Sequence, residues 1–399
     1  MSAAGIDHPL AGSKSEALLA ATEHQARARV ALSAALAAEP SHAYLFRGPR
    51  GSGKRAAARA FAAEMLAAAS ADPEDARRRA LLDPSPHPDL VWLAPTGAQH
   101  MVEEVRERVI RAAAYRPFEG GKRVFVVEAA EAMRDESQNA LLKTLEEPPE
   151  FVHLILLSSD GEGLLETVAS RCQTVEFAPL PAQIVEERLA DGTKSPPIDD
   201  KSAHQPTEVD RSARPEEIAA AARLAAGDLE RARLLLTEQG RQLRADVERC
   251  IEAALEGKCS GAPWKGLLDR AKGAGDDAEA AAREALEEES KAGIKRSAKE
   301  IGDGAKRAGR RRRTEILALA FELCATWLRD LAAVAAGAEE VVFNRDRLDT
   351  LRSQAQSLDP ASARRGAELV QETRCGLDLN VSEELALEAM FFRLESLFA

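Results

Sequence analysis

A glycine-rich segment at residues 48–55 contains the residue types that bind phosphate. It reads GPRGSGKR, whereas the phosphate-binding loop pattern G-x-x-x-x-G-K-[ST] ends in a hydroxyl residue. Glycines let backbone N–H groups converge on phosphate oxygens, and the lysine supplies charge for the β and γ phosphates. Arg55 stands where the hydroxyl would hold Mg²⁺, and a guanidinium cannot bind a metal ion. The residues that would line this damaged site are Gly48, Gly51, Ser52, Gly53, Lys54 and Arg55.

A second departure falls on the acidic residues that hydrolysis needs. Working nucleotide hydrolases of this kind place Asp and then Glu at the end of a buried strand. Here the apolar run 124–127 is followed by Glu128 and Ala129. Glu128 is either a metal ligand or a solvated carboxylate, and Ala129 has no group to position a water molecule. Together with Arg55, these residues predict no hydrolysis by this chain, no required cofactor, and at most weak binding of ATP or ADP.

The elements around these residues alternate between apolar strands and helices. Strands are predicted at 43–46, 90–93, 124–127, 154–157 and 175–177, and helices at 14–38, 55–69, 102–115 and 135–147. A polar, proline-bearing connection at 72–89 joins the helix after the loop to the second strand. Continuous apolar strands between helices favour a parallel sheet that is covered on both faces. The fold class is therefore α/β in the first 178 residues.

The chain changes character after Pro179. A helix is predicted from 182 to 190, and residues 191–215 are polar and proline-rich, which indicates a linker or an insertion. Helices resume at 216, and residues 265–313 form a charge-dense segment that is either a long helix or without fixed structure. Its basic end, Arg310–Arg313, either contacts DNA phosphates or is a solvated charge run or linker end. Apolar residues at helical spacing from 314 to 399 predict a packed helical bundle.

Composition narrows the function classes. The 399 residues are 45% hydrophobic and 30% charged, with a net charge of −12, which argues against a uniformly DNA-coating surface and leaves a local basic patch open. The five cysteines are scattered and never spaced C-x-x-C, which argues against a disulfide framework or a thiolate metal site. No apolar run of about 18 residues and no leader segment is present, so we expect a cytoplasmic protein without a membrane partner.

The triplet Ser170-Arg171-Cys172 gains meaning from its neighbours. Alone, it would be an ordinary surface arginine with a buried cysteine behind it. The segments that accompany it are HAYLF at 42–46, HPDL at 87–90, RPFEG at 116–120, NALLKTLEEPP at 139–149 and LLSS at 156–159. In combination, residues 14–180 closely resemble the clamp-loader branch of the AAA+ family. GDLERA at 227–232 is similar to the lid motif of that family, and residues 380–388 are similar to the last helix of its collar.

The resemblance implies three parts and one role. It implies an AAA+ RecA-like module at 1–178, a small helical lid at 179–240 with the insertion 191–215, and an all-helical collar at 241–399 with the insertion 265–313. Clamp loaders are five-subunit arcs that use ATP to place a sliding clamp on primer-template DNA. Their Ser-Arg-Cys arginine reaches the ATP site of the adjacent subunit, so Arg171 would be an arginine finger acting in trans.

Two kinds of subunit remain open within that family. A damaged loop combined with an intact Arg171 fits a stator-like subunit that completes its neighbour's site. The alternative is an ATP-hydrolysing motor subunit that tolerates Arg55. The partners implied are other clamp-loader subunits, the sliding clamp and, through the complex, DNA. Members often carry a four-cysteine zinc module after the loop helix, but residues 70–87 contain no cysteine, so no zinc and no other metal is predicted. Ser158, Ser159 and Arg231 lie at the family's sensor positions, with solvated or locally bonded side chains as the other reading.

Overall fold

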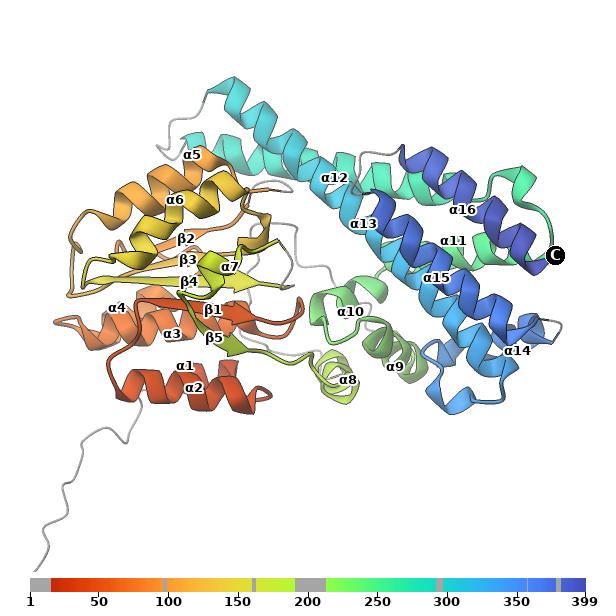
Figure 1. The fold of residues 1–399 in the computed structure, drawn as a ribbon, viewed down its shortest axis with the longest axis horizontal. Helices are drawn as coiled ribbons and strands as arrows, with labels where there is room; N and C mark the ends of the chain where they lie inside the picture. Colours follow the sequence, from red (N-terminus) through yellow and green to blue (C-terminus); the bar gives the residue numbers. More distant parts are fainter. Residues whose placement is uncertain are drawn as a thin grey trace, which may run out of the picture. The chain divides into compact units, whose positions relative to one another are not determined.

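The chain folds into two compact units. The computed structural model describes residues 16–95, 99–159, 163–190, 213–291, 297–356, 358–377 and 382–399. The described residues up to Pro179 form the first unit and those from Leu180 onward form the second. In Figure 1 the first unit runs from red to yellow-green, and the second runs from the yellow-green α8 through green to blue. We refer to them as the α/β unit and the helical unit.

A five-stranded sheet forms the centre of the α/β unit. Its strands are β1 (Ala43–Arg47), β2 (Leu90–Leu93), β3 (Arg123–Val127), β4 (Val152–Ser158) and β5 (Gln173–Glu176). The order across the sheet is β2-β3-β4-β1-β5, and every neighbouring pair is parallel. All residues of β3 and β4 are buried, which explains why these strands are continuous apolar runs. The predicted strands and their parallel arrangement are confirmed.

Helices cover both faces of this sheet. One face packs against α1 (Glu16–Ala21), α2 (Ala26–Ala37), α3 (Lys54–Ala68) and α4 (Pro73–Leu81), and the other against α5 (Val102–Val105), α6 (Asp135–Glu146) and α7 (Glu166–Ala169) (Figure 1). Successive strand side chains alternate between the two cores: Tyr44 and Phe46 point to the first, and Ala43 and Leu45 to the second. The predicted α/β class is therefore confirmed.

The connection at 72–89 contains a helix that the sequence reading missed. α4 begins after Asp72, whose side chain accepts a hydrogen bond from the backbone N–H of Asp75, and Pro73 occupies its first turn. Both are ordinary signals for a helix start. The predicted helix at 102–115 also differs, because α5 continues into a π-helical segment, Arg106–Arg111. A short 3₁₀ turn, Ala130–Ala132, follows β3.

The helical unit is built around one apolar cluster. Its helices are α8 (Ala182–Ala190), α9 (Pro215–Leu224), α10 (Leu229–Leu235), α11 (Glu238–Leu255), α12 (Lys265–Lys291), α13 (Ala298–Ala335), α14 (Leu348–Ala355), α15 (Pro360–Leu377) and α16 (Glu383–Phe398), with 3₁₀ turns at Cys259–Gly261, Glu339–Val341 and Arg345–Arg347. The cluster contains buried side chains from α8 through α16, including Leu189, Leu235, Trp327 and Phe391. The all-helical C-terminal part is confirmed, whereas its division at residue 240 into a lid and a collar stays a prediction.

The charge-dense segment forms a helical hairpin. α12 and α13 pack along each other, and the backbones approach so closely that a Cβ on Gly275 would lie 2.9 Å from the carbonyl oxygen of Gly309. Arg310–Arg313 lie inside α13, so the reading of this run as a linker end is wrong. Most of the insertion 191–215, and Asn380 and Val381 of the collar motif, lie outside the described residues.

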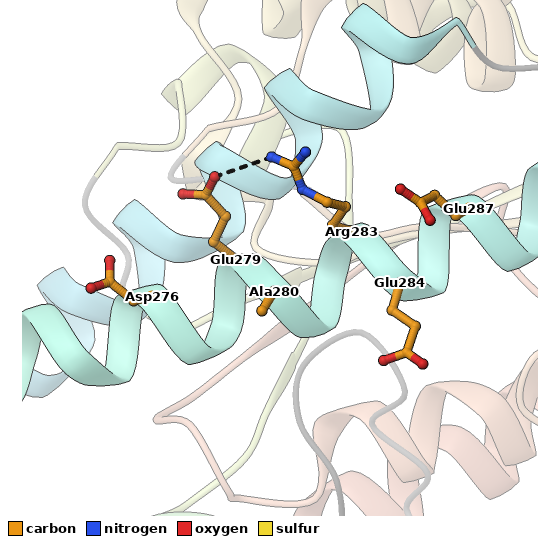
Figure 2. Close-up of a pocket in the computed structure, with 6 residues that line it drawn as sticks. All are labelled: Asp276, Glu279, Ala280, Arg283, Glu284 and Glu287. Carbon is orange, nitrogen blue, oxygen red and sulfur yellow. Dashed lines mark hydrogen bonds and ion pairs between the residues drawn. The ribbon is translucent and has the colours of Figure 1, made fainter.

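A shallow surface groove lies on α12. It is lined by Asp276, Glu279, Ala280, Arg283, Glu284 and Glu287 (Figure 2). Glu279 forms an ion pair with Arg283 at 3.5 Å. Its lining is mostly acidic, so it does not favour a phosphate ligand. In the described part of the chain, no helix has both the length and the apolar character needed to cross a membrane.

Candidate functional site

The glycine-rich loop joins β1 to α3 and has the backbone form of a phosphate cradle. Gly51 and Gly53 have φ angles of 71° and 90°, in the left-handed region that favours glycine. Gly48 packs against the segment after β5, where a Cβ would lie 2.1 Å from the carbonyl oxygen of Phe177. Its N–H donates to the carbonyl of Ser158 at the end of β4, at 3.2 Å. The sheet therefore fixes the start of the loop.

Lys54 turns its ammonium group onto the loop itself. Nζ donates to the carbonyl of Gly48 and, at 2.7 Å, to that of Pro49, and it lies 3.5 Å from Oγ of Ser52. The Lys54 and Ser52 side chains are both buried. In this arrangement the Lys54 ammonium group is bound by carbonyl oxygens of the loop, whereas in a nucleotide complex it would bind a phosphate. A phosphate ligand would therefore have to displace these bonds.

Arg55 forms an ion pair with Glu128. Its Nε lies 2.7 Å from Oε1 of Glu128, and its Nη2 lies 3.1 Å from Oδ2 of Asp83. The indole N–H of Trp92 donates to the same Oε1 of Glu128. The three charged side chains are about one-fifth exposed. Glu128 is thus neither a freely solvated carboxylate nor an open metal ligand, because a guanidinium already occupies the space beside it.

A second arginine completes this network, which we call the Arg55 network (Arg55, Arg59, Asp83, Trp92 and Glu128). Arg59 lies 3.0 Å from Oδ2 of Asp83, and its guanidinium sits 4.3 Å from the centroid of the Trp92 ring. Burial lowers the pKa of Arg59, while Asp83 acts in the opposite direction. Two cations and two carboxylates leave no net charge to attract a divalent ion. These residues do not fit Mg²⁺.

Two residues near the loop carried no recognisable signal in the sequence. Gln25 donates from Nε2 to the carbonyls of Ser52 and Ala178, at 2.9 and 2.7 Å, and its Oε1 accepts from the N–H of Ala178. His100 is buried, with Nε2 2.6 Å from the carbonyl oxygen of Glu128, and burial lowers its pKa. Both act through the backbone of distant segments, which neither motif nor periodicity reveals.

The remaining candidate positions have local roles in the structure. Ala129 has a φ of 47°, so the chain turns sharply directly after Glu128. The N–H of Ser159 donates to Oε1 of Glu131 at 3.1 Å. In the helical unit, Arg231 on α10 pairs with Glu322 on α13. Among the described residues, no three His, Cys, Asp or Glu side chains group as metal ligands would, and the absence of zinc stays a prediction.

The Ser-Arg-Cys triplet presents its arginine at the surface. Arg171 follows α7, and its side chain is 38% exposed. Its Nη1 donates to the carbonyl of Thr167 at 3.0 Å, and its Nη2 lies 2.7 Å from Oε1 of Glu146 at the end of α6. Ser170 Oγ donates to the same Thr167 carbonyl at 3.3 Å. Burial raises the pKa of Cys172 to about 12, so its thiol is a packing group rather than a nucleophile.

Most of the α/β unit is similar in sequence to clamp-loader subunits. A family model described as DNA polymerase III, delta subunit, matches residues 25–181. The chain is 33% identical over 161 residues to DNA polymerase III subunit delta′ of Bacillus subtilis, covering 39% of this chain and 48% of the relative. It is 40% identical over 152 residues to the delta′ subunit of Pseudomonas aeruginosa, covering 36% of this chain and 45% of the relative.

Subunits named tau/gamma match the same part of the chain. The Haemophilus influenzae protein is 33% identical over 152 residues, which cover 37% of this chain and 22% of that relative. The chain thus spans about half of the length of the delta′ relatives and less of the tau/gamma relative. The delta′ matches and the family model agree with the predicted clamp-loader resemblance. Residues 25–181 therefore resemble clamp-loader subunits, and they match the delta′ subunits at 33–40% identity.

Proposed function

We propose that this chain is a stator-like delta′ subunit of a bacterial DNA polymerase III clamp loader. It supports ATP-driven loading of the sliding clamp onto primed DNA by donating Arg171 to the nucleotide site of an adjacent subunit. One observation carries the proposal: Arg171 is exposed on its own unit, while Arg55 and Glu128 pair where a metal would be held. The chain places the Arg171 guanidinium in the nucleotide site of an adjacent subunit and hydrolyses no nucleotide itself.

The proposal assigns roles to the three predicted parts. Residues 1–178 form the AAA+ module, residues 179–240 the lid, and residues 241–399 the collar that holds the assembly together. Ser170 and Cys172 fix the backbone on either side of the finger. Gly48, Gly51, Ser52, Gly53 and Lys54 form the degenerate nucleotide site, with no required cofactor. The partners are the gamma/tau and delta type subunits, the sliding clamp and primer-template DNA, in the cytoplasm.

An ATP-hydrolysing motor subunit is the second candidate, because tau/gamma relatives match the same residues. It would require Glu128 to leave Arg55 and to serve as both metal ligand and base. The pairing of Glu128 with Arg55 and Trp92 argues against this. If the motor reading were right, the purified chain would hydrolyse ATP with Mg²⁺, and Lys54→Ala would abolish that activity.

The direct test is Arg171→Ala in a loader reconstituted from all its subunits. Because the finger neutralises charge that develops on the transferred phosphate, we expect DNA-stimulated ATPase and clamp loading to fall about tenfold or more. Assembly, followed by size-exclusion chromatography, should be unchanged. Arg111→Ala is a matched control, since Arg111 is exposed and pairs with Glu107 on its own helical segment. Rates equal to those of the unmodified loader would exclude the proposed role.

A further inference from the structure

We propose that Glu146 is a positioning residue for the Arg171 finger. Glu146 is the last residue of α6, and its Oε1 lies 2.7 Å from Nη2 of Arg171. The inference rests on the proposed function, because a positioned guanidinium matters only if Arg171 enters a neighbour's site. Glu146 would be a second residue, besides Arg171, through which this chain affects the rate of ATP hydrolysis in the adjacent subunit. Glu146 itself touches no nucleotide.

The two side chains are held in register by the core beneath them. Leu145 precedes Glu146 on α6, and Val168 lies in α7 just before Arg171; both are buried in the same apolar cluster. Gln138 on α6 adds polar ties, because its amide accepts from the N–H of Leu165 and donates to the carbonyl of Gly163, both at 2.7 Å. The distance between the ends of the two helices is therefore fixed by packing and hydrogen bonds.

The geometry leaves the finger free to bind phosphate. A guanidinium has five N–H groups in a planar fork. Glu146 and the Thr167 carbonyl each engage one terminal nitrogen of Arg171. The remaining N–H groups, on a side chain that is 38% exposed, can reach outward from the unit. Glu146 and Thr167 thus fix the direction of the side chain without using all of its donors.

The ion pair between Glu146 and Arg171 is weak enough to orient Arg171 without preventing it from binding phosphate. Glu146 is 50% exposed, and pairs this exposed are weak because water and salt screen them. A triphosphate with several negative charges competes easily with one screened carboxylate. The carboxylate therefore reduces the number of conformations that Arg171 must give up on binding, while it cannot hold the finger back.

The experiment measures steady-state ATPase of the reconstituted loader with Glu146→Ala, Glu146→Gln, Arg171→Ala and the double variant Glu146→Ala/Arg171→Ala. We expect Glu146→Ala to lower kcat about two- to fivefold, with little change in KM for ATP. Glu146→Gln keeps an acceptor oxygen and should recover most of the loss. In the Arg171→Ala background, Glu146→Ala should cost nothing more, because Glu146 acts only through Arg171.

Glu147→Ala is the matched control. Glu147 is the next residue, is equally an exposed glutamate, and makes no ion pair or side-chain hydrogen bond among the described residues. Its variant should behave like the unmodified loader. The inference is overturned if Glu146→Ala equals Glu147→Ala, if it raises kcat, or if it costs further activity in the Arg171→Ala background. A loader indifferent to Arg171→Ala would instead overturn the proposed function, so the two failures are distinguishable.

Discussion

Arg55 shows at the scale of one residue how a side chain of the glycine-rich loop can take part in an ion-pair network. Its guanidinium holds Glu128 and Asp83, with Trp92 beside it. A loop threonine would supply the hydroxyl that Mg²⁺ requires and would release Glu128. We therefore expect Arg55→Thr to bind ATP in a Mg²⁺-dependent manner, measured by calorimetric titration with and without the metal. Because two partly buried carboxylates lose a partner, the free energy of unfolding should fall by about 1–3 kcal/mol.

A substitution of Lys54 is the control for the expected gain in ATP binding. Arg55→Thr/Lys54→Ala should lose the new binding, since the β and γ phosphates then lack their cation. Ala129 is unchanged in both variants, so neither should hydrolyse ATP quickly. If Arg55→Thr binds ATP no better with Mg²⁺ than without it, the Arg55 network is not what excludes the metal.

Only part of this arrangement carries a signal in the sequence. Arg55 and Ala129 stood out because a local motif says which residue types belong there. Asp83 and Trp92 could not be recognised as partners of Arg55, since they come from a connection and a strand that only the folded sheet brings beside the loop. Glu146 was within a recognised motif, but the motif gave it no role; its contact with Arg171 depends on the packing of α6 against α7.

At the scale of elements, the α12–α13 hairpin depends on two glycines. A Cβ on Gly275 would lie 2.9 Å from the carbonyl oxygen of Gly309, and one on Gly309 would lie 2.8 Å from that of Gly275. A backbone atom cannot move aside as a side-chain tip can. We expect Gly275→Ala and Gly309→Ala each to lower the free energy of unfolding by about 1–3 kcal/mol, measured by urea denaturation followed by circular dichroism.

Gly273 and Gly302 are matched controls on the same two helices. A Cβ at either position meets no atom within 4 Å. Alanine there should raise stability by about 0.5–1 kcal/mol, because alanine favours the helix more than glycine does. A lower free energy of unfolding for alanine at Gly275 and Gly309, with a higher one at Gly273 and Gly302, would establish the close backbone approach. A change in the same direction at all four positions would contradict it.

These helices also explain where sequence reading fails for the fold. The five strands were predicted because a strand buried on both faces must be an apolar run. α12 and α13 approach each other most closely at Gly275 and Gly309, and glycines add nothing to a stripe of large apolar side chains. α4 lacks such a stripe as well: it is dominated by charged side chains, and its start signals, Asp72 and Pro73, are residue types that also occur in connections.

At the scale of the whole molecule, buried thiols link stability to pH. Cys250 and Cys324 lie in the core of the helical unit. Burial raises the pKa of Cys250 to about 12 and that of Cys324 well above its usual value. In the unfolded chain a thiol ionises near pH 8.5. Above that pH the unfolded state binds fewer protons than the folded state, so stability must fall as pH rises, by about 1.4 kcal/mol per pH unit for each such thiol.

This linkage gives a prediction with an internal control. In reducing buffer, the free energy of unfolding from urea titrations should be level between pH 7.5 and 8.5 as far as the thiols are concerned, and should then decline toward pH 10.5. Cys324→Ala should make this decline shallower by the contribution of one thiol, about 1.4 kcal/mol per pH unit, whatever its effect on stability at pH 7.5. Cys375→Ala is the matched control and should leave the slope unchanged, because Cys375 is exposed and its substitution removes no buried thiol. Equal slopes for the two variants would mean that the Cys324 thiol is as accessible in the folded protein as in the unfolded chain, which the packing of α11 and α13 around it does not permit.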